Sequence, residues 1–150
     1  MESKSNNFTS VKYHDIFDYK LTREELVKWK YKKEKAKVSK AWPTSLAKKR
    51  LEREKYSREK IKIAKRASKI ISKIGTVKFV GITGALAMMN AGRDSDIDLM
   101  IITSRGTLWL TRFFVYFALC TMHYVLRRPN DDNQRDALCL NLWLDESDLV

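Results

Sequence analysis

The second half of the chain alternates between apolar and polar segments. Residues 77–82 are apolar and rich in β-branched side chains, and residues 97–103 form a nearly continuous apolar run, so each predicts a buried strand. Leucine recurs at every second position in residues 137–144, which predicts a third strand. The leucines expected on one face of that strand are Leu138, Leu140, Leu142 and Leu144.

Helices are expected between and before these strands. Pro43 interrupts a basic stretch, and a helix is expected from there to about residue 74, because apolar side chains recur in it at helical spacing. A short helix is expected at 85–90 and a long one at 107–126. The order of elements predicts an α/β (α+β) fold, with a small mixed sheet of about three strands covered by helices.

The N-terminal part differs in composition. Short helices are expected at 13–18 and 23–33, the second of them starting with Thr22 and Glu25 at capping-box spacing. We therefore divide the chain into a basic helical region, residues 1–60, and a core domain, residues 61–150.

Positive charge is concentrated in one segment. Residues 28–73 carry 19 Lys and Arg against 4 Glu, whereas the whole chain has a net charge of +12. Such a segment attracts phosphate backbones, so nucleic acid is a candidate partner; the alternative is a solvated helix surface.

The remaining composition indicates a cytoplasmic protein. Cys120 and Cys139 lie in apolar runs without a second cysteine or a histidine at zinc-binding spacing, and the first ten residues contain no secretory signal. The helix at 107–126 approaches membrane-spanning length, but Arg112 and His123 interrupt it. We expect its apolar surface to contact a protein partner or a second copy of the chain, and we do not expect a membrane.

Candidate chemistry lies between the first two strands. Asp96 and Asp98 are two residues apart, so on a strand their carboxylates point to the same face and can converge on one hard cation. Gly84 follows the first strand, where it permits a close approach of phosphate to backbone N–H groups. The alternative for Gly84 is a simple strand-to-helix turn.

The segment from Gly81 to Met100 resembles the signature of the nucleotidyltransferase superfamily, which includes the palm of DNA polymerase β. Thr83, Gly84 and Ala85 are followed after ten residues by Asp96-Ile97-Asp98-Leu99, at the family's spacing. Ala85 stands where the family has Ser or Gly. Residues 15–26 also look like the opening of a winged-helix-like region found before some prokaryotic nucleotidyltransferases, although too few residues follow for a complete one.

The resemblance implies a function and a set of site residues. A hydroxyl would attack the α-phosphate of a nucleoside triphosphate such as ATP, with two Mg²⁺ ions held by Asp96 and Asp98. Thr83, Gly84 and Ala85 would contact the phosphates, with Ala85 lacking one hydroxyl contact, and Arg93 could neutralise their charge.

The family usually adds a third carboxylate from a later strand. Asp136 is the first candidate for it, and Asn141 is the alternative, as an amide that cannot act as a general base. The leading hypothesis is therefore an active nucleotidyltransferase. The other is a weak or inactive member of this fold that binds nucleic acid or a protein.

Overall fold

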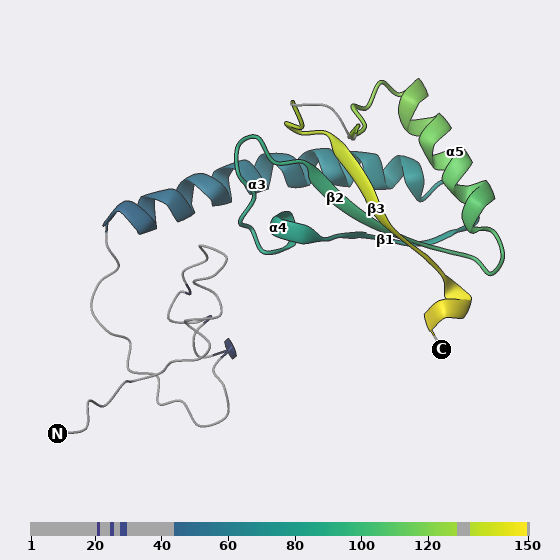
Figure 1. Cartoon of the computed structure of the whole chain (residues 1–150), viewed down its shortest axis with the longest axis horizontal. Helices are drawn as coiled ribbons and strands as arrows, with labels where there is room; N and C mark the ends of the chain where they lie inside the picture. The colour runs from purple at the N-terminus through teal and green to yellow at the C-terminus, as the bar shows by residue number, and fades with distance from the viewer. Residues whose placement is uncertain (1–20, 22–24, 26–27, 30–43, 129–132, 150) are drawn as a thin grey trace. The chain divides into compact units, whose positions relative to one another are not determined.

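The computed structural model (Figure 1) describes residues 21, 25, 28–29, 44–128 and 133–149. The chain divides into two units, 1–52 and 53–150, whereas the sequence suggested a division after residue 60. In the first unit the guanidinium of Arg50 pairs with the carboxylate of Glu25 at 2.7 Å. Most of the expected N-terminal helices, and the capping residue Thr22, lie outside the described residues.

The predicted fold class is confirmed: helices cover a small mixed sheet. The elements are, in chain order, α3 (Thr44–Ile71), β1 (Val77–Ile82), α4 (Gly84–Ala87), β2 (Ile97–Thr103), α5 (Leu108–Thr121), β3 (Leu138–Asp145) and a final turn of 3₁₀ helix, η1 (Glu146–Leu149).

The strand β2 is the centre of the sheet, whose order is β1-β2-β3. It pairs with β1 antiparallel and with β3 parallel. A parallel neighbour requires a crossover connection, and α5 supplies it. Because β2 has a strand on each side, any side chain on its exposed face lies between groups from β1 and β3.

One face of the sheet carries the core. Along β2 the buried residues alternate, beginning with Ile97, Leu99 and Ile101. They pack against α3 and α5, which run along this face (Figure 1). The contacting residues of the two helices are Ala64, Ala67 and Ile71 from α3, and Val115 and Leu119 from α5. Burial of this face leaves the other face of β2, which carries Asp98, available for a site.

One helix boundary and one face assignment were predicted wrongly. The last long helix ends at Thr121, so α5 has 14 residues, fewer than the roughly 20 needed to span a bilayer. In β3 the leucine alternation fails after Leu140, because a bulge separates the pair Asp98 and Cys139 from the pair Met100 and Leu142. Leu142 is consequently 41% exposed rather than buried with Leu138.

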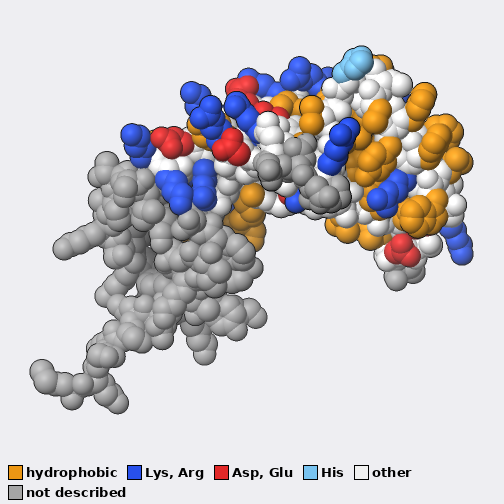
Figure 2. All heavy atoms as spheres, turned by 45° about the horizontal axis from the view of Figure 1, so that its top comes forward, with side chains coloured by type: hydrophobic (Ala, Val, Ile, Leu, Met, Phe, Trp, Pro, Cys, Tyr) orange, Lys and Arg blue, Asp and Glu red, His pale blue; other side chains and the backbone are white. Residues whose placement is uncertain are grey.

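The helix α5 has a large apolar surface. It buries the stripe that contains Thr111, Val115 and Leu119, while its exposed apolar side chains form a patch at the α5 end of the sheet (Figure 2). The exposed members of this patch include Trp109, Leu110, Phe113, Phe114 and Phe117. None of the helices in the described ranges is long and apolar enough to cross a membrane. A protein partner at this surface stays a prediction.

Candidate metal and nucleotide site

Polar side chains on one side of α3 bind the loop that precedes β2. Lys60 is 1% exposed, and its ammonium donates to the backbone carbonyl oxygens of Arg93 at 3.1 Å and of Ser95 at 2.7 Å. Its third bond goes to the carboxylate of Asp136, also at 2.7 Å. All three protons of the ammonium are therefore used, and they hold the residues directly before Asp96.

Two more side chains on the same side of α3 hold the start of this loop. The hydroxyl of Ser57, which is fully buried, accepts a bond from the backbone N–H of Ala91 at 3.1 Å. The guanidinium of Arg53 donates to the side-chain oxygen of Asn90 at 2.9 Å. Because positions 53, 57 and 60 are one helical turn apart, α3 contacts the loop along its length.

Asp96 and Asp98 converge as the sequence predicted. Asp96 directly precedes β2 and Asp98 is its second residue. Ligand atoms of these two carboxylates and of the Cys139 thiol all lie within 4.8 Å of one another. The two carboxylates suit a hard divalent cation, which prefers oxygen ligands, whereas the thiol is a soft group that binds metals as the thiolate.

Gly84 lies directly against Asp98. Its φ is +62°, in the left-handed region that glycine adopts without strain. A Cβ at this position would overlap the carboxylate of Asp98, and the neighbouring N–H of Thr83 donates to the backbone oxygen of Asp98 at 3.0 Å. The glycine turn and the aspartates therefore belong to one site, and a side chain at residue 84 would displace the second aspartate.

The turn offers less to a phosphate than the sequence suggested. The expected helix at 85–90 is only four residues long, Gly84–Ala87, and the side chain of Thr83 does not cap it. So short a helix has little macrodipole. Any phosphate at this turn would depend on individual backbone N–H groups and on a metal ion. Arg93 is exposed, and its carbonyl oxygen binds Lys60.

Asp136, the carboxylate expected to join the two aspartates, lies outside the group of Asp96, Asp98 and Cys139. Its carboxylate pairs with Lys60 and lies 3.6 Å from Arg135, and its backbone has a φ of +59°. From β3, Asn141 reaches the site as well as Cys139, because the Asn141 amide donates to the Asp98 carboxylate at 3.0 Å. Asp136 thus holds the loop in place, while an amide and a thiol from β3 adjoin the aspartates.

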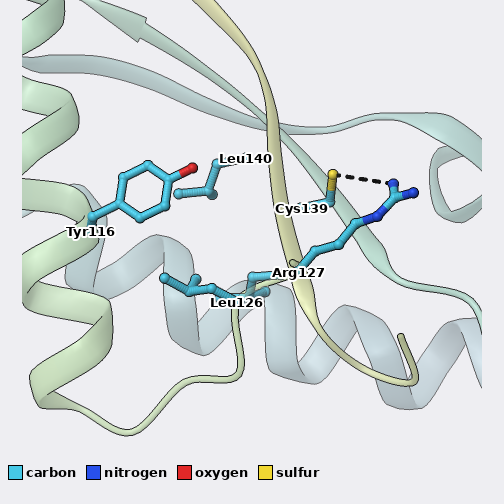
Figure 3. Close-up of a pocket in the computed structure, with 6 residues that line it drawn as sticks. Tyr116, Leu126, Arg127, Cys139 and Leu140 are labelled. Atoms are coloured by element: carbon cyan, nitrogen blue, oxygen red, sulfur yellow. Dashed lines mark hydrogen bonds between the residues drawn. The ribbon is translucent and has the colours of Figure 1, made fainter. Parts of the chain in front are cut away.

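Arg127 closes one side of the site. Its guanidinium donates to the Asp96 carboxylate at 2.8 Å and to the sulfur of Cys139 at 3.6 Å (Figure 3 shows the second contact). The segment that carries it is tied to β3, because the N–H of Arg127 donates to the carbonyl oxygen of Leu138. One positive charge is therefore already shared between a carboxylate and a thiol.

The surroundings of Asp98 and Cys139 favour the uncharged, protonated form of both side chains. Burial raises the pKa of Asp98 above its usual value, and the nearby charge of Asp96 raises it further, against smaller lowering effects of Cys139 and Arg127. The pKa of the Cys139 thiol is raised by burial, opposed by its bond from Arg127, and raised further by the two aspartates. A bound cation would reverse the repulsion between the two carboxylates.

Three of these residues were missed in the sequence. Lys60 stands in a run of lysines and arginines, and Arg127 in a segment expected to be a loop. Cys139 stands in an apolar run without a second cysteine or a histidine at zinc-binding spacing. The available signal was its position two residues before Asn141 in a predicted strand, which places both side chains on one face.

No protein-family model matches the chain, and searches of the curated proteins and of the solved structures likewise gave no match. The functional interpretation therefore depends on the residues of the site and on the resemblance of residues 81–100 to the nucleotidyltransferase signature.

Replacement of Lys60 should destabilise the domain. Lys60→Met removes the buried donor shared by the Asp136 carboxylate and the carbonyl oxygens of Arg93 and Ser95, so we expect a loss of about 2–4 kcal/mol in urea denaturation. Lys62→Met is the matched control, because Lys62 is exposed and its ion pair among the described residues is with Glu59 in the same helix; it should cost less than about 0.5 kcal/mol. Equal midpoints for the two variants would contradict the role of Lys60.

Neutralising Asp98 should stabilise the protein at neutral pH. Because the folded state raises the pKa of this carboxyl, its charge opposes folding above that pKa, and the penalty disappears as the pH falls through it. Asp98→Asn should therefore unfold at higher urea than the parent at pH 7, with the difference shrinking toward about pH 3. Asp94→Asn, in the exposed part of the loop, should show no such gain.

Proposed function

We propose that the chain is a metal-dependent nucleotidyltransferase, which transfers a nucleoside monophosphate from a nucleoside triphosphate to a hydroxyl group. One observation carries this proposal: Asp96 and Asp98 converge directly beside the left-handed turn at Gly84. A phosphate at the turn would be within reach of a cation at the aspartates. The resemblance of residues 81–100 to the family signature supports the same assignment.

The donor groups fit a divalent cation such as Mg²⁺. Asp96 and Asp98 would hold it, as carboxylates hold Mg²⁺ together with substrate phosphates. When bound, Mg²⁺ would polarise the α-phosphate and neutralise the departing pyrophosphate. Burial and, after it, repulsion from Asp96 raise the pKa of Asp98, and a bound metal would offset that repulsion by attracting both carboxylates.

The transfer itself is a displacement at phosphorus. The acceptor oxygen forms a bond to the α-phosphorus, the bond from that phosphorus to the bridging oxygen breaks, and pyrophosphate leaves with the electron pair. The hydroxyl proton passes to solvent, because the amide of Asn141 cannot accept it and the raised pKa of Cys139 keeps the thiol protonated at neutral pH. Slow turnover is the expected consequence.

A specific observation favours a second candidate function. Among the described residues, the groups around Asp98 include Asn141 and Cys139 where a third carboxylate would complete the family pattern. The same fold could then bind a nucleotide or nucleic acid with little catalysis. Exposed lysines and arginines of α3 supply the charge for nucleic acid; among them are Lys55, Arg58, Lys62, Lys65 and Arg66. Figure 2 shows such basic side chains along the edge that carries α3.

An assay of labelled triphosphates separates the two candidates. The protein is incubated with Mg²⁺, each α-labelled nucleoside triphosphate and a set of hydroxyl acceptors, and pyrophosphate and labelled product are measured. Asp96→Ala and Asp98→Ala should each lower product formation by more than about 100-fold, because the metal loses a ligand. Asp94→Ala is the matched control, since its carboxylate lies in the same loop outside the group.

Full activity of both aspartate variants would contradict the proposal. Salt-sensitive binding of nucleic acid that both variants retain, together with no turnover by the parent, would instead support the binding module.

A further inference from the structure

The thiol of Cys139 lies on the same face of the sheet as the aspartates. Cys139 is the direct neighbour of Asp98 in the parallel pair of β2 and β3. Leu138 and Leu140 are buried in the core, so the alternation of the strand places Cys139 on the opposite face. Its sulfur lies within 4.8 Å of ligand oxygens of Asp96 and Asp98. A soft sulfur ligand from β3 therefore adjoins two hard oxygen ligands.

The spacing of the three ligand atoms fits one metal ion. Zinc binds carboxylate oxygen and thiolate sulfur at about 2.0–2.3 Å, so ligand atoms of one ion lie roughly 3–4.5 Å apart. The ligand atoms of Asp96, Asp98 and Cys139 all lie within 4.8 Å of one another, so small side-chain rotations bring them onto a common ion. The distances therefore allow all three side chains to share one cation.

Neighbouring groups orient both carboxylates. The amide of Asn141 donates to Oδ1 of Asp98 at 3.0 Å, and Oδ2 of the same carboxylate lies against the Gly84 turn, where a Cβ would overlap it. Arg127 donates to Oδ2 of Asp96 at 2.8 Å. Outer hydrogen bonds of this kind orient metal ligands and strengthen metal binding. The site is therefore partly organised before a cation arrives.

The charges of the site match a divalent cation. Asp96, Asp98 and a Cys139 thiolate carry one negative charge each, and Arg127, which is ion-paired to Asp96, carries one positive charge. The two negative charges that remain equal the charge of one divalent ion. The guanidinium also contacts the sulfur at 3.6 Å, and this contact favours the thiolate that a metal requires (Figure 3).

Divalent cations differ in their preference for sulfur. Thiolate ligands select zinc and other soft or borderline metals, whereas Mg²⁺ takes oxygen ligands and keeps several waters. We propose that Asp96, Asp98 and Cys139 together bind a thiophilic divalent cation of the Zn²⁺ class, and that the site prefers this cation to Mg²⁺. The inference rests on the cation site of the proposed function. It assigns Cys139 as a third ligand, which Mg²⁺ does not use.

Binding of such a cation exchanges one bond of the thiol for another. The S–H bond of Cys139 breaks, the sulfur binds the cation through a lone pair, and the proton passes to solvent. No electron is transferred, so no oxidant or reductant is needed. Mg²⁺ leaves the thiol protonated and releases no proton from Cys139.

The two cysteines of the sequence give a matched pair of variants. Cys120→Ser keeps Cys139 as its thiol, and Cys139→Ser keeps Cys120, which is exposed on α5. Each full-length protein is titrated with Co²⁺, a spectroscopic substitute for Zn²⁺, and the ultraviolet thiolate-to-cobalt charge-transfer band is recorded. The parent and Cys120→Ser should show this band, saturating at one Co²⁺ per chain, and Cys139→Ser should lack it.

Calorimetric titration measures the preference between cations. Cys139→Ser should weaken Zn²⁺ binding at least about tenfold relative to Mg²⁺ binding, because Zn²⁺ loses a ligand that Mg²⁺ does not use. Asp96→Ala should weaken Co²⁺ binding by a similar factor, because the sulfur binds the cation together with the carboxylates. Asp94→Ala is the matched control and should bind Co²⁺ as the parent does, since its carboxylate lies outside the group.

A parent or Cys120→Ser protein without the thiolate band would overturn the proposal. An equal band in Cys139→Ser, or Co²⁺ binding that Asp96→Ala leaves unchanged, would overturn it as well. The Cys120→Ser protein decides the outcome even where Cys139→Ser fails to fold. The band without Mg²⁺-dependent transfer from labelled triphosphates would keep the cation site and remove the transferase function. Transfer without the band would keep that function and remove Cys139 as a ligand.

Discussion

The ammonium of Lys60 carries a positive charge into the interior of the domain, where an unpaired charge would be costly. Three acceptors satisfy it, two of them backbone oxygens of the loop before β2 and the third the carboxylate of Asp136. The loop between α4 and β2 therefore has a defined path, which also brings Ala91 onto Ser57. Without this contact a segment of turns would have to position Asp96 by its own conformation.

The position of the loop determines what the site can do. Asp96 and Asp98 end up on the free face of the central strand, with the left-handed Gly84 on one side and β3 on the other. Two negative charges this close repel each other, so a nearby cation stabilises them. Arg127 supplies part of this stabilisation through its ion pair with Asp96. Because Asp136 pairs with Lys60, β3 contributes an amide and a thiol to the site.

The sequence predicted the strands better than the site. Residues 77–82 and 97–103 match β1 and β2 because both segments are mainly apolar, rich in β-branched residues and bounded by turn residues. The helix α5 ends earlier than predicted. The residues after Thr121 are still largely apolar, but they are not helical. The pairing of Asp98 with Cys139 could not be predicted, because it depends on the register and the bulge between β2 and β3, which arise from tertiary structure. Lys60 could not be distinguished from its solvated neighbours by residue type.

The central claim is that the aspartates and the Gly84 turn form one cation and phosphate site. The most direct measurement is the broadening of backbone amide NMR signals by substoichiometric Mn²⁺, with and without a non-hydrolysable ATP analogue. Signals of Asp96, Asp98 and Gly84 should broaden first, and the analogue should increase the effect at Gly84. Broadening centred on another acidic segment, such as that of Glu146 and Asp148, or an analogue without effect at Gly84, would contradict the claim.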